Sequence, residues 1–220
     1  MRLDLHVHSA HSRDGTASPQ DIVRMCRKLG LAGLAITDHN SIDGSLAAHA
    51  LGRADGLLVV TGVEVSTSEG HVLAYGVREL IPRGLTAAET VERVRAAGGV
   101  AVAAHPRRFP SGVGLATAGA VAFDAVEVLN GGSSRGANKA ALRLAQGLGK
   151  SQTGGSDAHR LDEVGRAYTE AESVFTEDQV LEAMRKGATR AGGRSRTLRE
   201  GAVYTVETTV EWLRGGMSRL

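Results

Sequence analysis

Two histidines near the start of the chain have the type and spacing of a pair of metal ligands. His6 and His8 lie two residues apart in the apolar run LDLHVH. If this run is a β-strand, its side chains alternate between two faces, so both imidazoles share a face with Asp4. Neutral imidazole is the commonest metal-binding side chain, so the pair predicts part of a metal site. An isolated His-x-His also fits two histidines that pack or face solvent.

Further histidines and acidic residues stand in or beside other apolar runs. Asp38 and His39 follow the run LAGLAIT, Glu64 lies within LLVVTGVEV, and His71 opens HVLAYGV. His105 follows VAVAA, and Asp157 and His159 follow SQTGGS. In a β/α barrel the carboxyl ends of the strands converge on one rim, where sites are built. Buried charges must be paired or must bind metals, so packing alone does not explain this gathering. The pattern predicts a metal centre.

The elements that must position these residues alternate in type along the chain. Apolar runs typical of strands cover residues 3–8, 31–37, 57–65, 71–77, 100–104, 124–129 and 151–156. Amphipathic stretches typical of helices cover residues 19–29, 43–54, 86–97, 136–148 and 177–187. Capping signals support this pattern, with Ser18-Pro19 before the first helix and a Thr86–Glu89 capping box before the third. About seven βα units predict a single-domain α/β barrel rather than an open sheet.

Composition is that of an ordinary globular protein. The 220 residues are enough for one well-buried domain. We expect a cytoplasmic protein without membrane contact, because no apolar run approaches about 20 residues and the first ten residues are too polar for a secretory signal. The one cysteine, Cys26, excludes an internal disulfide and fits a small packing residue.

The end of the chain is basic. Residues 185–220 carry eight Arg or Lys against three Glu, although the whole chain has a net charge of only +2. We therefore divide the chain into a barrel over residues 1–187 and a basic extension over 188–220 that packs on it. Within the extension, 188–202 has the composition of a loop and 203–214 could form a last strand or helix. Only seven aromatic residues occur, which disfavours a dedicated single-strand nucleic-acid binder.

Six segments together resemble the PHP (polymerase and histidinol phosphatase) family. They are DLHVHS, SRDG, TDHN, GVEVS, AHP and GSDAH, and they span roughly residues 1–170 in this order. The resemblance implies a distorted seven-stranded β/α barrel with a two- or three-metal site. It also implies three ligand groups: His6, His8, Glu64 and Asp157; a second group that shares Glu64 and adds His71 and His105; and Asp14, His39 and His159.

The donor types indicate the metals and the chemistry. Mixed imidazole and carboxylate donors suit Zn, Mn or Fe better than Mg or Ca, which prefer oxygen ligands. Metals about 3.5–4 Å apart can activate water and stabilise the attacking and leaving oxygens of an in-line displacement. A phosphate ester is the natural substrate, because cations offset the charge of its oxygens. No side-chain nucleophile is required.

Four further residues are candidates for roles in catalysis. Asp38 could orient a ligand or transfer a proton, or it could cap the helix that follows. Arg107 follows His105 and Arg135 follows the Asn-Gly-Gly turn at Asn130, and either guanidinium could bind a phosphate. Asn130 itself matches a Glu-x-x-Asn pattern of the family. Two other histidines are not candidates: His11 fits a solvent-facing loop and His49 a helix.

We predict a hydrolase that cleaves phosphomonoesters, such as a nucleotide or a sugar phosphate, with metal-activated water. The segment between His105 and Glu127 is too short for the inserted domain of larger relatives, so we expect an open pocket. A phosphodiesterase or exonuclease acting on nucleic-acid ends and a non-catalytic metal-stabilised module remain alternatives. An amidohydrolase with a carbamylated lysine is disfavoured, because no lysine ends a strand among Lys28, Lys139, Lys150 and Lys186.

Overall fold

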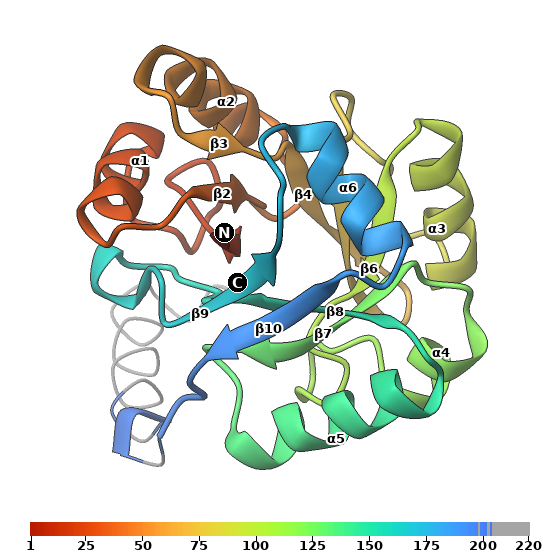
Figure 1. Ribbon diagram of the computed structural model, residues 1–220. Coiled ribbons are helices and arrows are strands. Elements are labelled where there is room, and N and C mark those ends of the chain that lie inside the picture. Colours follow the sequence, from red (N-terminus) through yellow and green to blue (C-terminus); the bar gives the residue numbers. More distant parts are fainter. Residues whose placement is uncertain (198, 202, 204–220) are drawn as a thin grey trace, which may run out of the picture.

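The computed structural model describes residues 1–197, 199–201 and 203 and arranges ten strands in two five-stranded sheets. The first sheet has the order β10-β9-β1-β2-β3 and comprises β1 (Arg2–Val7), β2 (Gly33–Ile36), β3 (Leu58–Val59), β9 (Ala167–Ala171) and β10 (Thr189–Gly193). The second runs in chain order through β4 (Gly62–Thr67), β5 (Gly70–Tyr75), β6 (Val100–Ala103), β7 (Ala125–Asn130) and β8 (Ser151–Gly155). Helices surround the strands (Figure 1).

The single-domain α/β class is confirmed, but the seven-stranded barrel is not, because the described residues form ten strands in two mixed sheets. The predicted run over residues 57–65 is interrupted at Thr61. There the backbone N–H and hydroxyl of Thr61 both donate to Glu177 Oε1 at 2.6 Å, and β3 and β4 on either side of this point lie in different sheets.

The C-terminal strands were not predicted from the sequence. β9 runs antiparallel to β1, and β10 antiparallel to β9. The prediction of a loop over residues 188–202 is therefore wrong at Thr189–Gly193. This strand, TRAGG, lacks the alternation of apolar and polar residues that marks a half-buried strand, and it lies at a sheet edge. The prediction for 203–214 and most of the basic extension lie outside the described residues.

The five predicted helices are confirmed as α1 (Pro19–Lys28), α2 (Asp43–Asp55), α3 (Ala87–Ala96), α5 (Arg135–Gly147) and α6 (Glu177–Arg185). Both predicted caps form: Ser18 accepts from the Asp21 N–H, and Thr86 makes the full capping box with Glu89. The short helix α4 (Leu115–Ala120) and the 3₁₀ turn η1 (Leu161–Glu163) are too brief for an apolar period and were missed. No helix in the described part of the chain is long and apolar enough to cross a membrane.

The faces of β1 divide as its alternating sequence predicts. Leu3, Leu5 and Val7 are fully buried in apolar clusters, and each such burial contributes about 1.5–3 kcal/mol. His6 and His8 lie on the opposite face. The two sheets meet beside these histidines, through a parallel bridge from Val7 to Ala158 and another from His39 to Glu64.

Candidate metal centre

The candidate residues gather where one set of strand ends meets. β6, β7 and β8 are parallel, and β4 has the same direction because β5 is antiparallel to both of its neighbours. His71 lies at the start of β5 and therefore at the same edge as the ends of β4 and β6. Backbone hydrogen bonds join this edge to β1 and β2, from Asp157 N–H to the His6 carbonyl (2.7 Å) and from Asn40 N–H to the Glu64 carbonyl (2.9 Å).

Glu64 is the centre of this gathering. Its Oε1 lies 2.9 Å from His71 Nδ1 and 2.9 Å from His105 Nε2. Its Oε2 lies 3.2 Å from the Nε2 atoms of both His6 and His8, and 3.3 Å from His39 Nδ1. One buried carboxylate therefore faces five imidazoles. Burial would raise the pKa of Glu64, but the surrounding histidines hold it well below its usual value.

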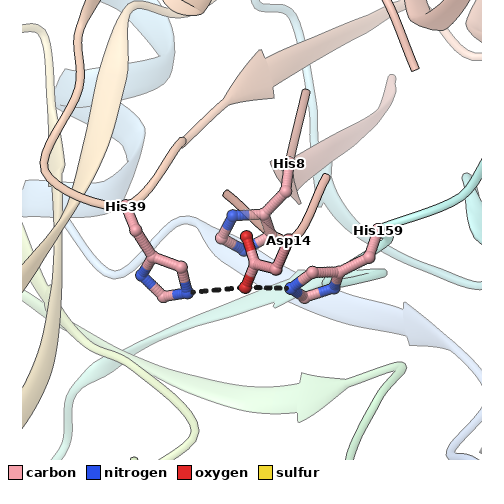
Figure 2. Close-up of side chains that lie close together, drawn as sticks. All are labelled: His8, Asp14, His39 and His159. Carbon is pink, nitrogen blue, oxygen red and sulfur yellow. Dashed lines mark hydrogen bonds and ion pairs between the residues drawn. The ribbon is translucent and has the colours of Figure 1, made fainter. Parts of the chain in front are cut away.

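Three clusters of potential ligand atoms result, each with its atoms within 4.8 Å of one another. They comprise His6, His8, Glu64 and Asp157; His39, Glu64 and His71; and His8, Asp14, His39 and His159. Figure 2 shows the last cluster, in which Asp14 Oδ2 lies between His39 Nε2 (3.5 Å) and His159 Nε2 (3.0 Å). Eight of the nine residues expected as ligands belong to these clusters, and the ninth, His105, lies outside them but contacts Glu64 at 2.9 Å. His8 and His39 each belong to two clusters, which the sequence did not indicate.

The donor atoms fit transition-metal ions. A tetrahedral shell with bonds of about 2.1 Å places its ligand atoms about 3.4 Å apart. His8 Nε2 lies 3.2 Å from Glu64 and 3.1 Å from Asp157, in that range. Asp14 Oδ1 and His39 Nδ1 are buried without a hydrogen-bond partner among the described residues, although both residues belong to the clusters. Cations would satisfy these atoms.

The charges of the cluster compensate one another. Burial would lower the pKa of His8, but hydrogen bonds and charges from Asp157 and Glu64 raise it to about 9. The pKa of His6 is likewise raised, because three carboxylates together outweigh its burial. Burial lowers the pKa of His39 to about 4, which keeps this imidazole neutral near pH 7. A metal must therefore displace protons from His6 and His8, whereas His39 is ready to bind.

Glu127 contacts the His6 ring at the nitrogen that faces away from the cluster. This residue was not among the predicted site residues. It is buried, and its Oε1 lies 2.8 Å from His6 Nδ1, on the side of the ring opposite the cluster. Its Oε2 accepts the His105 backbone N–H at 2.8 Å. A carboxylate behind a ligating histidine selects the tautomer whose other nitrogen can bind metal. A Glu inside the apolar run AVEVLN was a readable signal, because a buried acid needs partners.

A second buried acid, Asp38, lies beneath the turn that places Ser12 beside His8. Asp38 accepts the Ser9 N–H and hydroxyl, both at 2.6 Å, and so shapes the turn after β1. Ser12 on that turn lies 3.3 Å from His8 Nδ1. The alternative role for Asp38 as a helix cap is not observed, since α2 has Ile42 at its N-cap.

The remaining candidates separate into inner and outer positions. Asn130 is fully buried and donates to Glu127 (3.1 Å) and Asp157 (3.2 Å), so it holds ligands rather than presenting itself to solvent. Arg107 and Arg135 are exposed. Arg108, the neighbour of Arg107, instead forms an ion pair with Asp157 Oδ2.

Backbone strain is concentrated at the same edge. Four described residues other than glycine have positive φ, and three of them lie here: Asn40 (52°), His105 (26°) and Asp157 (52°). Side chains disfavour this region, and such residues persist where the surrounding structure holds them. The positive φ angles of His105 and Asp157 change the direction of the chain just after β6 and β8, where both side chains join the cluster.

Comparison with known proteins identifies relatives of the chain. A family model described as "PHP domain" matches residues 4–154, and one described as "PHP-associated" matches residues 135–189. An uncharacterized protein of Methanocaldococcus jannaschii is 36% identical over 116 residues, which cover 48% of this chain and 68% of that protein. The phosphoribosyl 1,2-cyclic phosphate 1,2-diphosphodiesterase of Eggerthella lenta is 38% identical over 88 residues, covering 37% of this chain and 33% of the enzyme.

Solved structures share the fold. A two-domain protein of Bacteroides vulgatus that contains a predicted PHP-like metal-dependent phosphoesterase aligns with a TM-score of 0.70 at 18% identity, over 88% of this chain and 65% of that one. The lesion-specific endonuclease of Pyrococcus furiosus aligns with a TM-score of 0.60 at 17% identity, over 93% of this chain and 66% of the endonuclease.

Proposed function

The chain belongs to the PHP domain family, and we propose that it is a metal-dependent phosphoesterase that hydrolyses phosphomonoesters with water as the nucleophile. One observation carries this proposal, the buried carboxylate of Glu64 surrounded by five imidazoles within 3.3 Å. Such a donor set suits two or three ions of Zn, Mn or Fe held close together.

The proposed ligands are the nine residues predicted from the sequence: His6, His8, Asp14, His39, Glu64, His71, His105, Asp157 and His159. When bound there, transition metals polarise phosphoryl oxygens and make water a better nucleophile at neutral pH.

The chain's own residues prepare the site for this chemistry. Glu127 holds the proton on His6 Nδ1, which leaves Nε2 free to bind. Asp38 acts as a positioning residue through Ser9 and the turn that carries Ser12. Arg108 places a guanidinium beside Asp157, where it can offset the charge of a phosphate oxygen. Arg107 and Arg135 are proposed as outer phosphate contacts.

The monoester is favoured by the number of oxygens that need compensation. A phosphomonoester presents three unsubstituted oxygens, and three donor clusters offer positions for cations around all of them. A diester presents two and needs space for its second substituent. Between β6 and β7 the chain forms only a loop and the six-residue helix α4, so no inserted domain stands between these two described strands.

Hydrolysis of phosphodiesters at nucleic-acid ends is the second candidate. The names of two similar proteins favour it, since the Eggerthella lenta relative is a diphosphodiesterase and the Pyrococcus furiosus structure is an endonuclease. The basic extension at residues 188–220 also favours it, because clustered arginines attract phosphates.

A substrate panel at several salt concentrations separates the two candidates. The protein, reconstituted with Mn, Zn or Fe, is assayed on nucleoside and sugar monophosphates, on diesters and on oligonucleotides. The proposal expects hydrolysis of monophosphates with a shallow dependence on salt. Activity restricted to oligonucleotides, falling steeply as salt rises, would establish the second candidate, because contacts to a phosphate backbone release counterions.

A further inference from the structure

Four arginines line a pocket to which none of the nine proposed metal ligands contributes. The volume of the pocket is about 330 Å³, within the range of about 300–1,000 Å³ that holds small ligands. This arginine pocket is lined by Arg160, Asp162, Glu163, Arg166, Arg196, Arg199, Glu200 and Val203. Guanidinium groups bind phosphate oxygens through paired hydrogen bonds, so four of them in one pocket have the chemistry of an oxyanion site.

The pocket is built from segments that lie far apart in the sequence. Glu163 belongs to η1, Arg166 immediately precedes β9, and Arg196 follows β10. The Arg194 N–H donates to the Arg166 carbonyl at 2.9 Å, and the Arg196 N–H donates to the Ser133 carbonyl at 3.1 Å. Because these backbone hydrogen bonds hold the segments together, a ligand meets arginines that are already in place, which lowers the entropic cost of binding.

Two of the guanidiniums are largely buried around one carboxylate. The side chains of Arg166 and Arg196 are 11% and 10% exposed, and both face Oε1 of the buried Glu163, at 3.6 Å and 3.5 Å. Charge-assisted hydrogen bonds between such groups are usually about 2.7–2.9 Å long. Each guanidinium also has five N–H donors, more than one shared oxygen can accept. The pair can therefore bind a further oxyanion.

The charges around the pocket favour an anion. Arg194, outside the lining, donates two hydrogen bonds of 2.9 Å and 2.8 Å to Glu200, and Arg160 lies 3.5 Å from Asp162. With Arg194 included, five arginines face three acidic residues, a balance of +2. Arg199 is exposed, so an anion from solvent can reach it. A phosphate group, with a charge of about −1.5 to −2 at pH 7, matches this balance.

Glu163 separates the pocket from the metal centre. Its Oε2 accepts the backbone N–H of the proposed ligand His159 at 3.0 Å, whereas its Oε1 faces the arginines. We propose that the arginine pocket is a second anion site, distinct from the metal centre, and that it binds a phosphate group. The phosphate bound there is not the reacting ester, because none of the proposed metal ligands lines the pocket. It is either free phosphate or a phosphate carried on a larger molecule.

The test is a calorimetric titration of the metal-loaded protein with inorganic phosphate at constant ionic strength. Arg199→Gln removes an exposed cation from the pocket. Arg93→Gln is the matched control, because Arg93 is exposed on α3, which packs against the second sheet. Glu163→Gln removes a negative charge from the pocket and can keep its oxygen on the His159 N–H. Circular dichroism checks that every variant folds.

The proposal expects one phosphate in the pocket in addition to any phosphate at the metals. Arg199→Gln should weaken binding to the pocket by about fivefold to fiftyfold, Glu163→Gln should strengthen it, and Arg93→Gln should match the wild type. Methylphosphonate replaces inorganic phosphate in a second titration and represents a phosphate carried on a larger molecule. Tighter binding of inorganic phosphate assigns the free anion to the pocket, and tighter binding of methylphosphonate assigns the carried group.

The result that would overturn the proposal is a single phosphate bound with the same affinity by the wild type, Arg199→Gln and Glu163→Gln. That result would leave the phosphoesterase intact. Binding of phosphate in the pocket alone, lost in Arg199→Gln, together with no hydrolysis of any ester, would support the second site and count against the proposed function.

Discussion

Replacing Glu127 with Gln should weaken metal binding although Glu127 touches no proposed metal position. The change keeps the size of the side chain and removes one acceptor oxygen. In the native protein both oxygens are used: Oε1 faces His6 Nδ1 at 2.8 Å, and Oε2 accepts from the His105 N–H at 2.8 Å and from Asn130 Nδ2 at 3.1 Å. Glutamine has a single acceptor oxygen and a donor amide.

The number of N–H donors around each oxygen position determines the orientation of the glutamine amide in the variant. Two N–H groups compete for the Oε2 position, so the one oxygen of the glutamine side chain is expected to stay there. Its amide then points at His6 Nδ1 and requires a lone pair on that nitrogen, which moves the His6 proton to Nε2. That proton occupies the position needed for a metal. Loss of such a partner typically costs about 10–100-fold in metal affinity, or about 1.4–2.7 kcal/mol.

The assay is a titration of metal-free protein with Zn or Mn in the presence of a competing chelator. Glu170→Gln is the control, because it makes the same chemical change at an exposed position of β9. Circular dichroism of the metal-free variants checks that both fold. If Glu127→Gln bound metal with the affinity and stoichiometry of Glu170→Gln, the tautomer argument would be wrong.

Three further predictions address the metal centre. Elemental analysis after metal-replete expression should find at least two transition-metal equivalents per chain, since the eight residues of the three clusters exceed the needs of one four-coordinate ion; one equivalent or fewer contradicts the multinuclear site. Alanine at His8, Glu64 or Asp157 should lower turnover by about a hundredfold or more, whereas His49→Ala on α2 should be nearly silent; equal losses would remove the basis of the site assignment. The third prediction concerns pH. Because the pKa of His8 is raised to about 9 without metal, metal binding must displace a proton, and the apparent metal affinity should rise about tenfold per pH unit for each displaced proton between about pH 6.5 and 9. The shift in Tm caused by a fixed concentration of free metal measures this, and a shift that does not change with pH contradicts it.

The sequence indicated the residues that gather at the candidate metal centre better than the strands that carry them. Candidate ligands could be selected because metal chemistry restricts them to few residue types, and their placement beside apolar runs made a shared edge the simplest arrangement. The run SQTGGS was the weakest predicted strand, yet it forms β8. Its glycines are required by close approach: a Cβ on Gly155 would lie 2.3 Å from His6 Cβ, and one on Gly154 would lie 2.5 Å from the Tyr168 carbonyl oxygen.

Glu127 and Arg108 escaped prediction for a different reason. Glu127 and His6 are 121 residues apart, so no local pattern joins them. Arg107 and Arg108 are adjacent and chemically identical, and only the turn after His105 determines that Arg108 reaches Asp157. Periodicity indicates which side of a strand a residue occupies, but not which of two loop residues faces inward.

Opposite charges compensate one another among the buried residues of the cluster. Burying the carboxylate of Glu64 without a partner would cost free energy, but protonated His6 and His8 face it. The same two histidines face Asp157. Burial would raise the pKa of Asp157, but Arg108 and the histidines hold it well below its usual value. Binding of metal exchanges the protons of His6 and His8 for cations. Because the contribution of His8 to metal-free stability is complete below about pH 6.5 and lost as pH rises through about 9, the metal-free protein weakens over the range in which its affinity for metal increases. Chelation should therefore destabilise the protein more at pH 8.5 than at pH 6.5, which a comparison of Tm with and without chelator at the two pH values checks.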